Sequence, residues 1–104
     1  MTVVNQMLFA AMVLFALPAA ARTLEVGEGR EFKLPSEAIR AAKEGDRVLI
    51  HPGEYFDCAV VAASRITIEG AGPDAGAVMT DRACQGKAIL VTTGNDITLR
   101  NLTL

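Results

Sequence analysis

The first 21 residues differ from the rest of the chain in their hydrophobic pattern. Met7–Leu17 is an unbroken run of apolar side chains, and no charged residue precedes Arg22. A run of this length is too short for a membrane span, which needs roughly 20 residues, but it fits the apolar core of a secretory signal peptide. Small side chains at Ala19 and Ala21 suit a signal peptidase. The pattern therefore predicts a helical signal peptide over residues 1–21, cleaved between Ala21 and Arg22.

Cleavage of this segment would place the protein in the periplasm or outside the cell, with no stable membrane span left. The alternatives are an uncleaved anchor and a buried helix, because no lysine or arginine precedes the apolar run. Removing residues 1–21 leaves residues 22–104, which is enough for one domain with a marginal core.

Residues 22–46 show the pattern of one strand and one helix. Thr23–Val26 alternates polar and apolar side chains, which predicts a short strand. Leu34–Glu44 carries apolar side chains at helical spacing and charged ones on the other side, which predicts a one-faced helix. Ser36 can cap this helix, and Gly45 suits the position after its end.

Residues 47–104 contain only short β-type runs separated by Gly, Asn, Asp and Pro. Ile66–Gly70 is echoed by Ile97–Asn101, 31 residues later, and Ala59–Val61 by Ala88–Val91, about 29 residues later. A repeat of short strands without helices predicts a solenoid, in which each coil stacks on the one before. The predicted strands are Arg47–Ile50, Cys58–Val61, Ile66–Glu69, Ala77–Met79, Ala88–Val91, Ile97–Leu99 and Leu102–Leu104.

The segment Ser36–Tyr55 reads Ala-Ile-x-x-Ala-x-x-Gly-Asp-x-Val-x-Ile-x-Pro-Gly-x-Tyr from its third residue on. This order resembles the opening of right-handed parallel β-helix proteins of the pectin-lyase-like superfamily, and residues 66–70 and 97–104 look like their rungs. The resemblance implies a mostly β fold, a right-handed parallel β-helix. Residues 22–46 would form its N-terminal strand and capping helix, and residues 47–104 its first rungs.

The resemblance extends to the fold and not to a catalytic site. In the polysaccharide lyases and hydrolases of this superfamily, the catalytic residues lie on later rungs, so it supplies no catalytic residue here. No C-terminal cap is recognisable near Leu104, and an uncovered coil end invites aggregation. We therefore expect the natural protein to continue beyond Leu104.

Both cysteines, Cys58 and Cys84, lie after the predicted cleavage site. Disulfides persist in exported proteins, so the pair predicts one intramolecular bond. Closing a loop of this length would stabilise the fold by roughly 3 to 4 kcal/mol. Two separately buried thiols and an intermolecular bond are the alternatives.

Few side chains are candidates for chemistry. His51, the only histidine, could act as a general base, but the sequence shows no group to orient it, so a rim histidine is the more typical interpretation. Glu54 and Asp57 could form a carboxylate pair for glycoside hydrolysis or a Ca²⁺ site, although most such residues are solvated turn residues. Tyr55 and Phe56 could stack on a sugar ring or anchor a turn on the core.

Several polar residues between the strands are typical of turns. Asp74 and Asp81 flank a stretch with the composition of a loop excursion, where they would serve solubility. Asn95 and Asn101 suit turns and could form a stacked ladder, and Asn101 also opens a glycosylation sequon. Gly70–Gly72 lacks the strand-to-helix context of a dinucleotide-binding loop.

The charge balance narrows the classes of partner. A net charge of −2 and only five aromatic residues, four Phe and one Tyr, argue against a nucleic-acid partner. We identify no catalytic, cofactor-binding or metal-binding residue in the chain as given, which leaves open whether it is an enzyme. The first hypothesis is a structural cap and scaffold of an exported β-helix that contacts polysaccharide or a cell-envelope component. The alternatives are the start of a secreted polysaccharide lyase or glycoside hydrolase with a downstream active site, and a small exported binder or inhibitor.

Overall fold

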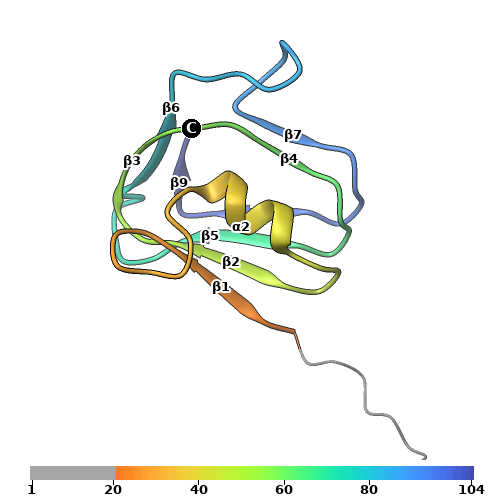
Figure 1. Cartoon of the computed structure of the whole chain (residues 1–104), viewed down its shortest axis with the longest axis horizontal. Coiled ribbons are helices and arrows are strands. Elements are labelled where there is room, and N and C mark those ends of the chain that lie inside the picture. The colour runs from red at the N-terminus through yellow and green to blue at the C-terminus, as the bar shows by residue number, and fades with distance from the viewer. Residues whose placement is uncertain (1–20) are drawn as a thin grey trace, which may run out of the picture.

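The computed structural model describes residues 21–104, so the predicted signal peptide lies outside the described residues except for Ala21. The described residues form a parallel β-solenoid of about three turns with one short helix (Figure 1). Its elements are β1 (Thr23–Val26), α2 (Pro35–Ala41), β2 (Arg47–Ile50), β3 (Gly53–Phe56), β4 (Ala59–Val61), β5 (Thr67–Gly70), β6 (Ala77–Thr80), β7 (Leu90–Thr92), β8 (Thr98–Arg100) and β9 (Leu102–Thr103).

Three parallel sheets form the walls of the solenoid. Their strand orders are β1-β2-β5-β8, β3-β6-β9 and β4-β7, so neighbouring strands in a sheet come from successive coils. Strands β2, β3 and β4 form the first full coil, β5, β6 and β7 the second, and β8 and β9 belong to the third. Side chains alternate between the two faces of each strand. In β2, for example, Val48 and Ile50 are buried, whereas Arg47 is exposed. The alternation read from the sequence therefore corresponds to an apolar interior and a polar exterior.

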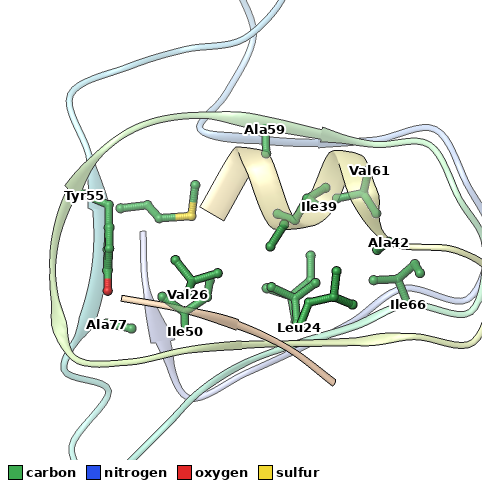
Figure 2. Packing of buried hydrophobic residues seen from close by; sticks show 14 residues of the cluster. Leu24, Val26, Ile39, Ala42, Ile50, Tyr55, Ala59, Val61, Ile66 and Ala77 are labelled. Atoms are coloured by element: carbon green, nitrogen blue, oxygen red, sulfur yellow. The ribbon is translucent and has the colours of Figure 1, made fainter. Parts of the chain in front are cut away.

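The interior is built from columns of apolar side chains that stack from coil to coil (Figure 2). In the first sheet, Leu24 pairs with Val48, Val48 with Ile68, and Ile68 with Leu99. The first three side chains are 1%, 0% and 0% exposed, whereas Leu99 is 42% exposed. Along this column, the core is thus closed through the second coil and open at the third.

Helix α2 packs against the first coil. It contacts β4, β1 and β2, and it lies between β4 and β2 within the outline of the coil (Figure 1). Ala38 and Ile39 are buried there, as the apolar stripe of the sequence indicated. The predicted cap was wrong: the N-cap residue is Leu34, and the backbone N–H of Ser36 donates to Asp57 instead.

The helix is also shorter than the sequence indicated, because it ends at Ala41 rather than Glu44. The backbone of Ala42 is extended, with ψ of 138°, and the next backbone N–H, that of Lys43, donates to a carboxylate oxygen of Asp46 at 2.9 Å. The Asp46 side chain thereby accepts a hydrogen bond that a longer helix would have made internally.

The sequence analysis missed one strand, β3, because it assigned residues 53–56 to a turn. Parallel pairing with β6 makes the segment a strand, and every second side chain then points inward. Tyr55 accordingly lies in the core, 8% exposed. The repeat itself was found, but its offset is 31 residues in both places, because Ala59 pairs with Leu90 and Thr67 with Thr98.

Candidate functional site

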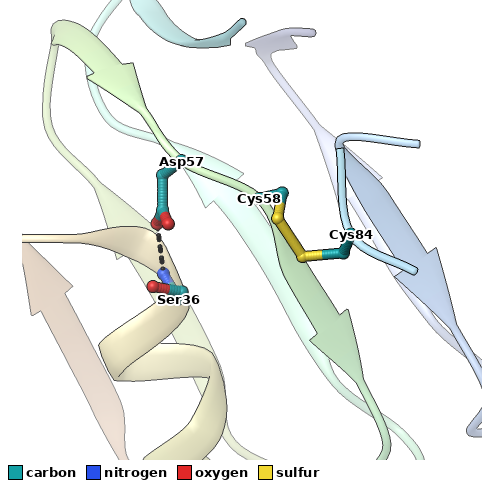
Figure 3. The surroundings of a disulfide bond; sticks show 4 residues. All are labelled: Ser36, Asp57, Cys58 and Cys84. Carbon is teal, nitrogen blue, oxygen red and sulfur yellow. Dashed lines mark hydrogen bonds between the residues drawn. A yellow bond between two sulfur atoms is a disulfide. The ribbon is translucent and has the colours of Figure 1, made fainter. Parts of the chain in front are cut away.

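The predicted disulfide between Cys58 and Cys84 is present. Cys58 lies just before β4, and Cys84 lies in the excursion between β6 and β7 (Figure 3). The two Cα atoms are 5.5 Å apart. The bond therefore fastens the excursion of the second coil to the wall of the first.

A groove of about 830 Å³ lies between the loop that follows β1 and strand β3. The side chain of Phe56 is 60% exposed on it, and that of Leu34 is 38% exposed. Strand β3 is the edge strand of its sheet, and no backbone hydrogen bond in the described residues joins it to the opposite loop. The groove lining comprises Gly27, Glu28, Gly29, Lys33, Leu34, Pro52, Gly53, Glu54, Tyr55 and Phe56.

Strand β3 places on opposite faces the two aromatic side chains, Tyr55 and Phe56, that the sequence analysis treated as a pair. The Tyr55 hydroxyl donates a hydrogen bond to the carbonyl oxygen of His51 at 2.7 Å, and burial raises the pKa of this phenol. Phe56, one position later, points to the opposite face and is exposed. Only Phe56 therefore offers a ring face for stacking, while Tyr55 anchors the strand from inside.

The carboxylates of Glu54 and Asp57 have separate surroundings rather than a shared site. Glu54 is exposed in the groove. Asp57 is 8% exposed and accepts a hydrogen bond from the backbone N–H of Ser36 at 2.7 Å (Figure 3). Asp57 thus fixes the first turn of α2 to the segment before β4. Within residues 21–104, no group of three or more His, Cys, Asp or Glu side chains is arranged to hold a metal ion.

His51 does have an orienting partner, which the sequence analysis missed. Its Nε2 lies 2.8 Å from Oε1 of Glu25, and the Arg30 guanidinium lies 3.2 Å from the same oxygen. The hydrogen bond from His51 lowers the pKa of Glu25, with a smaller contribution from Arg30. Glu25 precedes His51 by 26 residues. Only the pairing of Val26 with Ile50 brings the two side chains together, so the strand register was the missing signal.

The turn residues serve the coil itself. Asp74, in the turn between β5 and β6, and Asp81, directly after β6, adopt positive φ angles of 65° and 60°. Asn101 has φ of 54°, and its side-chain amide nitrogen donates to the carbonyl oxygens of Gly70 and Gly72 at 2.8 and 2.6 Å. The Asn101 amide of the sequon is therefore engaged in holding the preceding coil.

Asn95 and Asn101 do not form the stacked ladder that the sequence analysis suggested, because the two residues bind different partners. The side-chain oxygen of Asn101 accepts from the backbone N–H of Ala75 at 3.0 Å, whereas Asn95 uses its backbone N–H to bind Ser64 Oγ at 3.0 Å.

A side chain at Gly70 would overlap with the carbonyl oxygen of Asn101. The absence of a side chain at Gly70 is thus what lets the third coil approach here.

The fold defines the class of protein as a parallel β-solenoid stabilised by one disulfide. No family model, curated protein or solved structure matches the chain. Over residues 21–104, no helix has the length and apolar character that crossing a membrane requires.

Proposed function

We propose that the chain is a non-catalytic scaffold, formed by the first coils of an exported right-handed β-helix of the pectin-lyase-like kind, that contacts carbohydrate through the groove beside β3. The observation that carries the proposal is the exposed ring of Phe56. A solvent-facing aromatic ring on a rigid strand is a surface on which the apolar face of a sugar can stack.

The surroundings of Phe56 supply the polar groups that a saccharide needs. Glu28, Lys33 and Glu54 line the same groove. None of the ion pairs among residues 21–104 involves these three side chains, so they are free to bind hydroxyl groups. The groove volume of about 830 Å³ also falls in the range of roughly 300–1,000 Å³ that is common for ligand sites.

The scaffold part of the proposal is supported by the difference between the two ends of the solenoid. Helix α2 packs on the first coil and completes its core. At the third coil, Leu99 continues the interior column but is 42% exposed. An apolar interior surface of this kind suits the stacking of a further coil.

Carbohydrate contact is tested by titrating the isotope-labelled protein with neutral and acidic oligosaccharides, such as cellohexaose and oligogalacturonate, and following backbone amide signals by NMR. We expect shifts confined to β3 and the loop after β1. Phe56→Ala should weaken binding about tenfold, which corresponds to a stacking contribution near 1.4 kcal/mol. Leu104→Ala, an exposed apolar side chain outside the groove, is the matched control. An absence of shifts with every saccharide, or binding that Phe56→Ala leaves unchanged, would contradict carbohydrate contact.

The scaffold role is tested by light scattering on the purified protein. We expect self-association that rises with concentration and that Leu99→Lys reduces, because a charge disfavours burial of this face. A monomer with a cooperative melting transition would instead favour a small exported binder or inhibitor. For the enzyme alternative, later coils with Asp, Lys and Arg clustered on one face would be expected in the reading frame beyond Leu104.

A further inference from the structure

Asp46 is a nearly buried carboxylate at the corner where α2 leads into β2. It is 4% exposed. One carboxylate oxygen accepts a hydrogen bond from the backbone nitrogen of Arg22 at 2.9 Å, and the other accepts from the backbone N–H of Lys43 at 2.9 Å. The Arg22 guanidinium adds a weaker contact at 3.4 Å and is itself about half exposed.

The backbone nitrogen of Arg22 is the atom that the predicted processing step would change. A signal peptidase hydrolyses the Ala21–Arg22 bond by adding one water. The hydroxyl becomes part of the Ala21 carboxylate, which leaves with residues 1–21. The Arg22 nitrogen becomes a primary amine, which takes up a proton near neutral pH because α-amino groups have pKa values of about 7.7–8.0.

We propose that Asp46 is the binding site for the amino terminus that processing creates. A neutral N–H would be replaced by an ammonium group on the same carboxylate oxygen, and hydrogen bonds between two charged groups are roughly twice as strong as neutral ones. This inference goes beyond the scaffold function and depends on cleavage before Arg22.

The position of Arg22 makes this capture compatible with the fold. Its carbonyl oxygen accepts a hydrogen bond from the backbone N–H of Arg47 at 2.9 Å, so the residue is held from both sides. Its guanidinium also donates to the carbonyl oxygen of Ala41 at 3.3 Å, near the end of α2. The new amino terminus would therefore join β1, the end of α2 and the start of β2 at one buried carboxylate.

The test uses protein produced from the full chain in a secreting host, with the start of the mature protein determined by mass spectrometry. The cost of Asp46→Asn is then measured by urea unfolding in two forms of the protein, one with a free amino terminus and one with the amino terminus selectively acetylated. Acetylation restores a neutral amide at this position. We expect the substitution to lower the folding equilibrium constant about tenfold more with the free amine than with the acetylated one. Glu44→Gln, an exposed acid two residues away, should show less than about a twofold difference, as surface pairs do.

An equal cost of Asp46→Asn in the two forms would overturn the proposal, as would a mature protein that does not begin with Arg22. Should the substituted protein not fold, the acetylation rate of the unsubstituted protein decides. We expect its α-amine to react at least about tenfold more slowly than that of the tripeptide Arg-Thr-Leu-amide, because the ion pair holds it protonated and bound. Equal rates would overturn the proposal.

Discussion

The contrast between Ile68 and Leu99 gives the most direct test of the solenoid. The two side chains are consecutive members of one interior column, since they pair directly between β5 and β8. Ile68 is 0% exposed and Leu99 is 42% exposed. Replacing each by alanine removes the same amount of hydrocarbon at two different depths of the same column.

The expected costs follow from this difference in burial. Ile68→Ala removes apolar groups worth about 2.4 kcal/mol of transfer free energy, at roughly 0.8 kcal/mol per methylene. A cavity closed by Val48 on one side adds to this cost, so a total of about 3–4 kcal/mol is expected. Leu99→Ala removes a side chain that keeps much of its contact with water and leaves no closed cavity. About 1 kcal/mol is expected there.

The assay is urea unfolding followed by circular dichroism, with the slope of the free energy against urea checked to be unchanged. Ile68→Val, a smaller deletion at the buried site, should cost about 0.5–1.5 kcal/mol and calibrates the scale. Equal costs for Ile68→Ala and Leu99→Ala would refute the reasoning, because they would mean that the interior of the third coil is covered as well as that of the second.

Three further predictions concern single contacts. Replacing Cys58 and Cys84 by serine should lower the free energy of unfolding by roughly 3–4 kcal/mol, because the bond closes a loop with a separation of 26 residues; an unchanged denaturation midpoint would speak against this. Asp57→Ala should cost about 1.5–3 kcal/mol by removing the charged acceptor of the Ser36 N–H, and helical circular dichroism should weaken with it. Glu31→Ala, which removes an exposed carboxylate from the loop after β1, serves as the control. The pKa of Asp46 lies below its ordinary value of 3.8 because the backbone N–H groups of Arg22 and Lys43 donate to it. The contribution of Asp46 to stability is therefore fully present above about pH 4 and is lost as the pH falls through the lowered pKa. Asp46→Asn should make the free energy of unfolding less dependent on pH in this acid range, and an unchanged dependence would contradict the assignment.

The sequence predicted the solenoid because the signals it depends on are local. The alternation of Arg47, Val48, Leu49 and Ile50 marks a strand with one apolar face, and the repeat at 31 residues marks successive coils. A pair of cysteines in a predicted exported chain was enough for the disulfide. These features need no knowledge of which strand lies beside which.

The contacts that the sequence analysis missed all depend on the tertiary arrangement. Glu25 meets His51 and Arg22 meets Asp46 because β1 pairs in parallel with β2, and Asp57 meets the start of α2 because the helix packs beside β4. Strand β3 was missed for a related reason. Its four residues include a glycine and one exposed carboxylate, and its partner β6 supplies the pairing that makes it a strand.

The disulfide also decides how the protein would respond to mechanical force. A solenoid pulled along its axis comes apart between coils, since the contacts there are backbone hydrogen bonds and stacked side chains. Cys58 belongs to the first full coil and Cys84 to the second, so these two coils share a covalent link that force must leave intact. The third coil has no such link among the described residues. Extension should therefore proceed first through β8 and β9, while the linked pair of coils yields together and later.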